Sequence, residues 1–581
     1  MEPENLHKMR HSLSHLLAAA VLEFYPDAKL AIGPAIDTGF YYDFEFSSPV
    51  SDKDLGKIEQ KMRELLKKGL TFEKKNISEK EAKKLFANNP YKLELIADIE
   101  KEGGQPTIYT SGDFTDLCAG PHISNTKEIP AGSFKLERIA GAYWRGNEKN
   151  KMLTRIYGLA FESKEKLEEY EKMMVEAEKR DHRKLAKDLN LFMISEQVGK
   201  GLPLWLPNGA FIRHQLEQYM YDKETAHDYK YVVTPVLTHK GLYEKSGHLE
   251  HYHNDMYSPI NIEGEDYYLK PMNCPHHHMI YNHTSLSYRD LPLRLAEAGL
   301  VHRFERSGVL TGLIRARCFT QNDSHIYCAK KDLKNELLGV MSLFKEVYEE
   351  FKITDYWYRL SLPDFSNAEK YGDIGNKKMW DEAGQVAEEV LKELGVKYVV
   401  GSGEASFYGP KIDVQIKNAI GKEDTIATAQ IDFYSAGRFD LEFTNEKGEK
   451  EKPVIIHRAI MGSFDRFFAF LTEQTAGNFP LWLSPVQIKI IPVRENHNDY
   501  AKKVAEELKV VGVRVDFDDS DEGMGKKIRA GKNSKVPYML VIGDKEIESG
   551  ELALEIRDGT QQKITLEKLK TKLQSEISER Q

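Results

Sequence analysis

The sequence has few cysteines, no long apolar run and no excess of positive charge. Its four cysteines are scattered over 581 residues, which is too few and too dispersed for a disulfide framework. The first residues, MEPENLHKMRHSLSH, lack the apolar segment of a secretory signal. No stretch of about 18 apolar residues is present to form a transmembrane helix. These absences favour a reducing, cytoplasmic compartment and exclude a membrane partner.

The composition is that of a large globular protein. The chain is 41% hydrophobic and 30% charged, and its formal net charge is −9. Its length predicts two to four domains. Because the net charge is negative, a nucleic-acid partner would need local basic patches rather than a basic surface overall.

Changes in pattern along the chain predict four segments. Residues 1–161 mix a helix with strand-like pieces such as GFYYDFEF (39–46) and RIYGLAF (155–161). Residues 162–190 are charged and lack glycine and proline, which predicts a long, solvated linker helix. Residues 191–483 alternate strand-like segments with polar motifs, and residues 484–581 read strand, helix, strand. The last pattern predicts a small α/β domain with a largely parallel sheet.

Three short stretches far apart in the chain supply one cysteine and two histidines. They are PMNC, QNDSHIY and VIIHRAIMGS, which contain Cys274, His325 and His457. Structural zinc sites usually have paired short spacings and four protein ligands, whereas catalytic sites have three ligands and one open position. The set is therefore interpreted as a catalytic zinc site, although cysteine and histidine are also common in protein cores.

Two further stretches connect this set to a known family. VHRFERSGVLTGLIRAR (301–317) and GSFDRFFAF (462–470) resemble motifs 2 and 3 of class II aminoacyl-tRNA synthetases. With the Cys/His/His set interleaved, nearly the whole chain resembles the threonyl-tRNA synthetases. The resemblance implies a multidomain α+β and α/β protein: an N-terminal α+β editing domain, a class II catalytic domain with an antiparallel sheet, and a C-terminal α/β anticodon-binding domain.

The resemblance also implies an activity and partners. The protein would use ATP with Mg²⁺ to activate threonine, and it would transfer the threonyl group to threonine tRNA. One Zn²⁺ per subunit would be the cofactor. Motif 1 resemblance around YVVTPVL, with Pro235, implies a homodimer formed across that strand. The ubiquitin-like domain that often precedes this module in the family is expected to be missing.

The ATP site implied by motifs 2 and 3 is rich in arginine. Arginine suits phosphate because its donors form a planar fork, and fixed cations stabilise the charge that develops during adenylate formation. A single arginine is more often a surface residue, but R-x-E, R-x-R-x-F and G-S-x-x-R together favour catalysis. The resemblance places Arg303 on the α-phosphate, Glu305 near the adenine amino group, Arg315 near the outer phosphates, Phe319 against adenine and Arg466 on the γ-phosphate, with Gly462 and Ser463 allowing close approach.

The zinc would discriminate between amino acids. A threonine site must reject valine, which is nearly isosteric, and a site that binds the hydroxyl discriminates by about 10⁴ or more. By resemblance, the pocket is completed by Gln321, Asp323, Tyr408 and Gln430, with Lys411 beside it. His276, His277 and His278 follow Cys274 where the family usually has Gly-His, and they are interpreted as local surface or pocket lining. Cys318 and Cys328 match no ligand position and are expected to be packed thiols.

A second polar set lies near the N-terminus. HSLSH puts His11 and His15 on one helical face, and DLCAGPH supplies Asp116, Cys118 and His122. Such a set could bind a metal, and either half alone could be structural. Together they resemble the editing domain shared by threonyl- and alanyl-tRNA synthetases, in which the threonyl type is thought to hydrolyse seryl-tRNA without metal. Lys92, in NNPYKLEL, matches a further lysine of that site.

The C-terminal segment resembles the anticodon-binding domain of this subclass. Glu546 matches a base-reading position, whereas the family often has Asn, Arg and Arg at the places of Asp521, Lys535 and Glu555. An acid cannot donate to a base edge and repels phosphate. Arg557 or Arg529 could substitute. A generic α/β partner-binding domain is the alternative.

Two rival functions are weighed against threonine–tRNA ligation. A prolyl or seryl sister enzyme is one, but prolyl enzymes lack a zinc in the amino-acid pocket. A non-catalytic RNA-binding paralogue is the other. It should have lost the arginines of the ATP site, yet Arg303, Arg315 and Arg466 are all present.

Overall fold

The computed structural model describes residues 2–367, 371 and 377–580. The chain divides into two compact units, Met1–Val175 and Glu176–Gln581. Within the described ranges, no helix combines the length and the apolar character that crossing a membrane requires.

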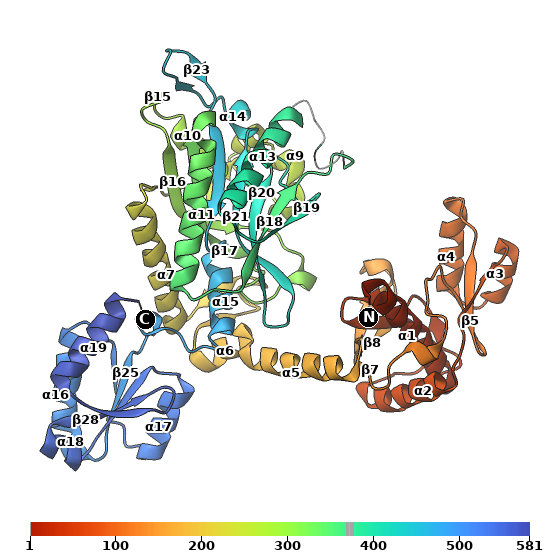
Figure 1. Cartoon of the computed structure of the whole chain (residues 1–581), viewed down its shortest axis with the longest axis horizontal. Helices are drawn as coiled ribbons and strands as arrows, with labels where there is room; N and C mark the ends of the chain where they lie inside the picture. The colour runs from red at the N-terminus through yellow and green to blue at the C-terminus, as the bar shows by residue number, and fades with distance from the viewer. Residues whose placement is uncertain (1, 368–370, 372–376, 581) are drawn as a thin grey trace. The chain divides into compact units, whose positions relative to one another are not determined.

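In the first unit a long helix packs on an antiparallel sheet. Helix α1 (Pro3–Phe24) buries Leu13, Leu16 and Leu17 on the face that meets this sheet. The sheet has the order β1-β3-β8-β7, with β2 on β3, and helix α2 (Leu55–Lys67) packs against α1 (Figure 1). The strands are β1 (Lys29–Leu30), β2 (Ala35–Ile36), β3 (Gly39–Glu45), β7 (Phe134–Tyr143) and β8 (Met152–Ala160).

A smaller sheet of the same unit, with two helices, forms a second hydrophobic core. The sheet has the order β4-β5-β6, and the two helices cover it. Ile96 and Ile108 are buried between them. The elements are β4 (Glu73–Asn76), β5 (Thr107–Ser111), β6 (Phe114–Leu117), α3 (Glu79–Leu85) and α4 (Pro90–Lys101).

The segment 162–190 forms two helices, so the prediction of one solvated linker helix is wrong in its second half. Helix α5 (Lys164–Arg180) ends before Asp181, whose backbone has ψ 120° and whose side chain caps α6 (His182–Leu189) by accepting from the Arg183 N–H. Helix α6 buries four of its residues, His182, Leu185, Ala186 and Leu189. Its apolar face explains the break, because α6 joins the core of the second unit.

The second unit is built on an eight-stranded sheet with the order β11-β16-β17-β24-β21-β20-β18-β19. All pairings are antiparallel except the two at the edges, β11–β16 and β18–β19. Strand β24, VIIHRA, is buried throughout because it lies in the middle of the sheet. The strands are β11 (Lys230–Tyr231), β16 (Leu293–His302), β17 (Cys318–Cys328), β18 (Tyr356–Leu362), β19 (Tyr398–Ser402), β20 (Lys411–Lys417), β21 (Glu423–Asp432) and β24 (Val454–Ala459).

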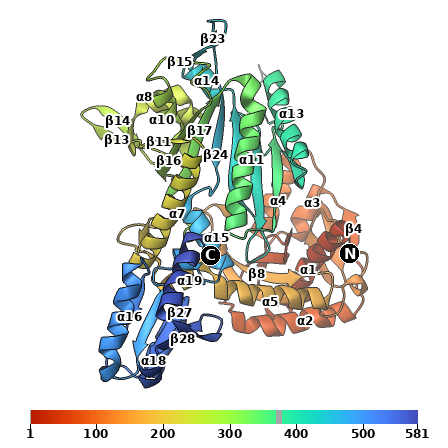
Figure 2. The same cartoon turned by 60° about the vertical axis from the view of Figure 1, so that its left-hand side comes forward.

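Helices cover this sheet and bring further segments to it. Helix α11 (Leu333–Glu350) packs on β17 and β24, and α13 (Lys377–Glu393) packs on β18 and β20 (Figure 2). Helix α15 (Phe464–Gln474) packs on β17, α6 and α7. The surrounding elements are α7 (Pro207–Ala226), α8 (Lys240–Ser246), α9 (His248–His251), α10 (Cys274–Tyr281), α14 (Ser435–Arg438), β9 (Phe192–Ile194), β10 (Pro203–Trp205), β12 (Leu237–His239), β13 (Ile260–Ile262), β14 (Glu265–Leu269), β15 (Leu286–Ser287), β22 (Phe443–Thr444) and β23 (Lys450–Glu451).

The C-terminal segment folds around a five-stranded sheet with the order β26-β25-β27-β28-β29. The first three strands are parallel, while β28 and β29 are antiparallel, so the sheet is mixed rather than largely parallel. Its elements are β25 (Ile488–Pro492), β26 (Val515–Phe517), β27 (Tyr538–Ile542), β28 (Glu551–Ile556), β29 (Gln561–Thr565), α16 (Asn498–Val510), α17 (Met524–Asn533), α18 (Asp544–Ser549) and α19 (Leu566–Ser578). The closing hairpin follows from the turn at Asp558 and Gly559, where only a short connection joins the strands.

Candidate functional site

Four neighbouring strands of the large sheet carry a row of polar residues at one level. His325 on β17 pairs with His457 on β24, His457 pairs with Gln430 on β21, and Gln430 pairs with Lys411 on β20. Residues directly opposite each other on adjacent strands project from the same face of a sheet. Strand register therefore brings together residues that are more than a hundred positions apart in sequence.

Cys274 joins this row from the first turn of α10. One ligand atom from each of Cys274, His325 and His457 lies within 4.8 Å of the others, and all three residues are buried. Burial raises the pKa of the Cys274 thiol and lowers the pKa of His325 well below its ordinary value. The predicted set thus converges into one buried Cys/His/His cluster.

Hydrogen bonds to the two imidazoles test whether the cluster fits a metal. Nδ1 of His325 lies 2.8 Å from Nδ1 of His277, whose Nε2 lies 3.2 Å from Glu297. Nε2 of His457 lies 2.8 Å from Asp432 Oδ2. Each imidazole of the cluster therefore uses one ring nitrogen for a neighbour and keeps the other as a ligand atom, as metal-binding histidines do. The donor set fits Zn²⁺.

The two carboxylates behind these histidines are themselves held in place. Glu297 accepts from the Thr234 N–H at 2.8 Å and lies 3.4 Å from the buried Lys270 ammonium. Asp432 Oδ1 accepts from the backbone N–H groups of Tyr434, at 2.7 Å, and Ser435, at 2.9 Å. Fixed carboxylates orient the rings and select their tautomers.

The histidines after Cys274 are not surface or pocket-lining residues, so that interpretation is wrong. His276, His277 and His278 are 7%, 0% and 1% exposed. His276 Nε2 lies 2.7 Å from Thr238 Oγ1, and His278 Nδ1 lies 2.9 Å from the Tyr327 hydroxyl. All three are buried because α10 packs its whole first turn into the domain, and His277 supports the Cys/His/His cluster directly.

A cavity of about 450 Å³ opens over the cluster. The Tyr408 hydroxyl donates to Gln430 Oε1, and the Tyr408 ring stacks on His457 with 4.9 Å between centroids. Desolvation raises the pKa of Asp323, which accepts from Asn273 Nδ2 at 2.9 Å. Predicted residues that line this cavity are Cys274, Arg303, Gln321, Asp323, His325, Tyr408, Gln430 and His457. Lys411 is not among them, because its ammonium pairs with Asp413 at 3.1 Å.

A second cavity, of about 220 Å³, adjoins the first. Arg303, Gln321 and Gln430 line both, so the two cavities are direct neighbours that share part of their walls. The second cavity is lined by every residue that the motifs predicted for ATP, namely Arg303, Glu305, Arg315, Phe319, Gly462, Ser463 and Arg466.

Contacts within the second cavity fix its charged side chains. Arg315 Nε donates to Glu305 at 2.9 Å, and the Arg303 guanidinium lies 5.2 Å from the centre of the Phe319 ring. Ser463 caps α15 by accepting from the Arg466 N–H at 3.0 Å. Gly462 has a φ of 61°, and a Cβ there would lie 2.6 Å from the Ile426 carbonyl oxygen, so only glycine fits this turn.

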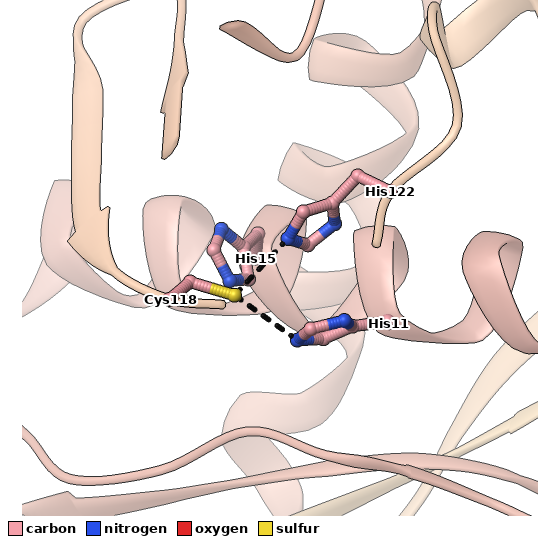
Figure 3. Close-up of side chains that lie close together, drawn as sticks. All are labelled: His11, His15, Cys118 and His122. Atoms are coloured by element: carbon pink, nitrogen blue, oxygen red, sulfur yellow. Dashed lines mark hydrogen bonds between the residues drawn. The ribbon is translucent and has the colours of Figure 1, made fainter. Parts of the chain in front are cut away.

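A separate polar site lies in the first unit, between α1 and the loop after β6 (Figure 3). The Cys118 sulfur lies 3.4 Å from His11 Nε2 and 3.3 Å from His122 Nε2. The rings of His15 and His122 are 4.3 Å apart. Burial lowers the pKa of all three histidines and raises that of Cys118 to about 11. Burial therefore favours the neutral forms of these imidazoles and of the thiol.

Neighbouring groups assign the tautomers in this site. His11 Nδ1 donates to the Pro121 carbonyl at 3.1 Å, which leaves Nε2 as an acceptor facing Cys118. Ser12 donates its proton to the Lys8 carbonyl, so its oxygen accepts from His122 Nδ1 at 3.0 Å. His122 Nε2 is then also an acceptor. Two imidazole lone pairs converge on one thiol, which provides general bases beside it.

Lys92 and Asp116 complete the polar neighbourhood as a buried ion pair. Their side chains are 2.6 Å apart, and the Tyr42 hydroxyl donates to Asp116 at 2.5 Å. The Lys92 charge contributes to the lowered pKa of His15. All six residues predicted for this site therefore come together in the structure.

Comparisons with known proteins identify the domains that carry these sites. Residues 257–475 match the tRNA synthetase class II core domain (G, H, P, S and T), residues 487–576 the anticodon binding domain, and residues 107–157 the threonyl and alanyl tRNA synthetase second additional domain. The threonine–tRNA ligase of Staphylococcus carnosus is 48% identical over 567 residues, which cover 97% of this chain and 87% of the relative. The chain belongs to the threonine–tRNA ligase family. The predicted multidomain fold class is thereby confirmed.

Two further members of the threonine–tRNA ligase family are also similar to this chain. The enzyme of Anoxybacillus flavithermus is also 48% identical, with 97% of this chain and 87% of the relative covered. The crystal structure of the RNA binding domain of threonyl-tRNA synthetase from Cryptosporidium parvum Iowa II aligns with a TM-score of 0.64 and 35% identity. It covers 68% of this chain and 98% of that one.

The C-terminal residues predicted to read the anticodon are engaged locally. Glu546 accepts from the Gly543 N–H at 2.9 Å and so caps α18. Glu555 pairs with Lys532 at 2.8 Å. Arg557 donates to the Phe479 carbonyl at 3.0 Å, a packing contact that does not suit a substitute tRNA contact, whereas Arg529 is exposed. Direct base reading by Glu546 stays a prediction.

Residues that the sequence analysis missed lie behind the Cys/His/His cluster. Glu297 and Asp432 hold the histidines of the cluster, and His277 connects one of them. The run of three histidines after Cys274 was the available signal. The role of this run could be recognised only from the strand register, in which Glu297 pairs with Asp323 across β16 and β17.

Proposed function

We propose that Cys274, His325 and His457 hold one Zn²⁺ per chain and that this site selects threonine by its hydroxyl. The observation that carries the proposal is the shared level of His325 and His457 on adjacent strands, with one nitrogen of each ring bonded to a buried neighbour. Zinc there supplies a Lewis acid with an open coordination position for polar groups of the amino acid.

The family activity sets the frame for this site. Threonine–tRNA ligases join threonine to its tRNA with ATP and Mg²⁺, and the additional domain that this chain shares supports hydrolytic editing. Adenylate formation needs the threonine carboxylate beside the α-phosphate of ATP. The shared wall of the two cavities supports this arrangement, because Arg303 and Gln321 border both.

The side chains of the larger cavity would orient threonine. Gln430 Oε1 accepts a hydrogen bond from the Tyr408 hydroxyl, so the carboxamide is held in one orientation toward the cavity. Asp323, fixed by Asn273, offers an acceptor for an ammonium or hydroxyl group. A buried acceptor that valine cannot satisfy is a strong source of discrimination, about 10⁴-fold or more.

In the smaller cavity, Arg303, Arg315 and Arg466 would bind the phosphates and stabilise the charge that builds up as pyrophosphate leaves. Arg466 projects from the first turn of α15, whose N-terminus also favours anions. Phe319, at the side of the Arg303 guanidinium, offers a ring face for adenine. Glu305 would accept from the adenine amino group.

The N-terminal site would correct the error that this selection leaves. Serine keeps the hydroxyl and lacks one methyl group, which is worth only about 1–3 kcal/mol. His11 and His122 present neutral acceptor nitrogens that can move a water proton, and His15, Lys92, Asp116 and Cys118 shape the site. The converging lone pairs support hydrolysis of seryl-tRNA without a metal.

A homodimer and a cytoplasmic location complete the proposal. In the motif 1 segment, which follows the edge strand β11, the side chain of Val233 is 94% exposed. Such apolar exposure supports a partner subunit at this edge of the sheet. All four cysteines are free thiols, in keeping with a reducing compartment. Replacing Val233 with Asp should shift the sedimentation equilibrium toward monomer.

Measurement of ATP–pyrophosphate exchange with each standard amino acid tests the proposed function. Threonine should support the fastest exchange, serine a weaker rate, and valine almost none. Exchange supported best by proline, or exchange with no amino acid at all, would contradict it.

A further inference from the structure

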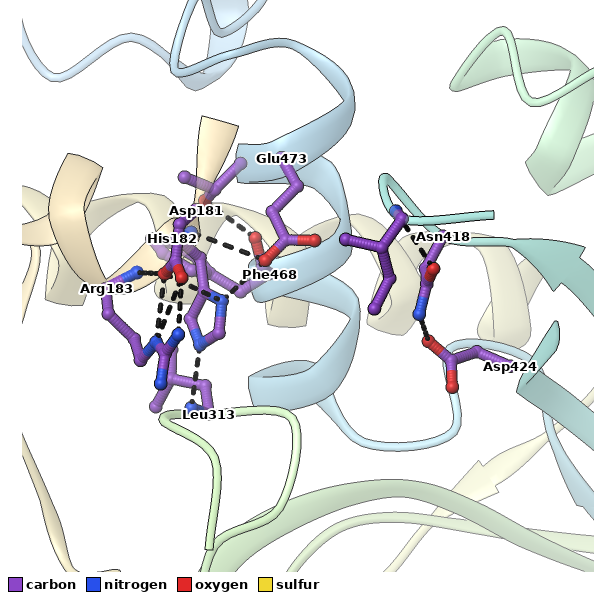
Figure 4. A network of polar contacts seen from close by, with 10 residues as sticks. Asp181, His182, Arg183, Leu313, Asn418, Asp424, Phe468 and Glu473 are labelled. Carbon is purple, nitrogen blue, oxygen red and sulfur yellow. Dashed lines mark hydrogen bonds and ion pairs between the residues drawn. The ribbon is translucent and has the colours of Figure 1, made fainter. Parts of the chain in front are cut away.

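His182, the first residue of α6, connects three segments (Figure 4). It lines a third cavity, of about 670 Å³, together with Arg315 and Arg466 of the ATP motifs. Its side chain is 1% exposed. Nδ1 lies 2.7 Å from Glu473 Oε1 on α15, and Nε2 lies 3.2 Å from the backbone nitrogen of Leu313. His182 belongs to none of the sites predicted from the sequence.

The two contacts define a neutral imidazole. The Leu313 N–H can only donate, so Nε2 accepts, and the Glu473 carboxylate accepts, so Nδ1 donates. Ligand atoms of Asp181, His182 and Glu473 lie within 4.8 Å of one another, which also resembles a metal cluster. Because both ring nitrogens are already used, the imidazole has no lone pair left for a cation.

Leu313 belongs to the loop between β16 and β17 that carries the arginines of motif 2. The next residue, Ile314, accepts from Arg466 Nε through its carbonyl at 3.2 Å, and Arg315 follows. Arg466 and Glu473 are seven residues apart on α15, which places them on one face two turns apart. Helix α15 therefore holds this loop at two consecutive residues, once through Arg466 and once through His182.

Gly312 shows how closely the loop approaches the ring. Its φ is +49°, and a methyl group at this position would overlap the His182 imidazole. Any other residue at this position would strain the backbone. Its side chain would also push the loop away from the ring and break the Leu313 hydrogen bond. The close approach and the hydrogen bond depend on each other.

We propose that His182 is a positioning residue for ATP: it fixes the motif 2 loop to α15 so that Arg315 and Arg466 meet the phosphates in one geometry. The inference rests on the ATP-site assignment made above. It makes the junction of the α5–α6 segment part of the adenylation site, although His182 touches no substrate.

Two carboxamide variants separate the two hydrogen bonds. In His182→Gln the carboxamide oxygen can take the place of Nε2 and accept from Leu313. In His182→Asn the carboxamide sits at the place of Nδ1, so it can donate to Glu473 but cannot reach Leu313. The Asn variant should raise the KM for ATP in pyrophosphate exchange by ~10-fold, the effect of leaving one buried backbone donor unpaired. The KM for threonine should stay within about twofold, and Gln should restore the KM for ATP.

Arg315→Ala serves as the reference for the ATP-site assignment, and Gly312→Ala as a second variant that displaces the loop from the ring. Both should also raise the KM for ATP and leave the KM for threonine unchanged. If Arg315→Ala has its effect and His182→Asn has none, the inference is overturned while the site assignment stands. If Arg315→Ala has no effect, the assignment fails and the inference fails with it. An equal rise of both KM values in His182→Asn, unrepaired by Gln, would show a structural role and also overturn it.

Discussion

Replacing Asp432 with Asn should weaken zinc binding although it changes no proposed ligand. Asp432 Oδ2 lies 2.8 Å from Nε2 of His457, so the carboxylate holds the ring proton on Nε2 and leaves Nδ1 for the metal. An asparagine in the same orientation presents its NH₂ group to Nε2. The proton then moves to Nδ1, where it blocks the ligand atom.

The amide cannot avoid this by turning over. Asp432 Oδ1 accepts from the backbone N–H groups of Tyr434 and Ser435, at 2.7 and 2.9 Å. A turned amide would keep the His457 tautomer but set its NH₂ group against these two donors. Leaving a buried donor unpaired costs about 1–3 kcal/mol. Either orientation gives a penalty in the range known for residues behind metal ligands, about 10- to 100-fold in metal affinity.

Competition with a chromogenic zinc chelator measures this effect directly. The Asp432→Asn protein should bind zinc ~10- to 100-fold more weakly than the wild type, and its KM for ATP should be unchanged. Asp440→Asn is a matched control, because the side chain of Asp440 is 83% exposed in the nearby turn. Zinc affinity within twofold of the wild type in Asp432→Asn would refute the tautomer argument.

Further predictions concern the other sites. Arg303→Ala should lower pyrophosphate exchange by ~10² or more, the loss typical of one donor aimed at developing charge; a change of a few-fold would refute its role. The double variant His11→Ala, His15→Ala should charge threonine normally but accumulate seryl-tRNA, and deacylation of added seryl-tRNA at the wild-type rate would exclude the editing site. Because burial lowers the pKa of His11 and lowers that of His15 well below its ordinary value, both should take up protons less readily than an ordinary imidazole as the pH falls from 7.5 to 6. Seryl-tRNA hydrolysis should change little over this interval, whereas an imidazole with the ordinary pKa of about 6.5 would lose roughly three quarters of its neutral form.

Local sequence patterns predicted the elements of the fold well. The strand-like segments at 39–46 and 155–161 became β3 and β8. The spacing of His11 and His15 placed both on one face of α1. The hydrophobic pattern of a segment depends only on nearby residues, so it predicts the secondary structure of that segment without knowledge of the tertiary fold.

Features that depend on packing could not be predicted from the sequence. The helix break at Asp181 could not be predicted within the charged segment 162–190. Helix α6 has only four buried positions, which are too few to indicate a buried face in the sequence. The polar run His276–His278 is buried because partners from β12, β16 and β17 satisfy it. The C-terminal sheet is mixed because its last two strands close by a hairpin, which a strand-helix-strand reading does not foresee.

The chemistry of the candidate sites was predicted in part. The ligand types and the arginines of the motifs follow from what zinc and phosphate require, whatever their distance along the chain. The residues that support the ligands cannot be predicted in this way, because the roles of Glu297 and Asp432 depend on strand register and hydrogen bonding. His182 is the clearest case, since a histidine in a charged helix carries no signal of its contact with Leu313.

The zinc content of purified Cys274→Ser protein tests the central claim most directly. Elemental analysis of the wild type should give about one zinc per chain, because its three buried donors leave one position open. The serine variant, which has lost its thiolate, should contain almost none and should not activate threonine. A Cys274→Ser protein that retains a full equivalent of zinc would contradict the assignment of Cys274, His325 and His457 as the metal site.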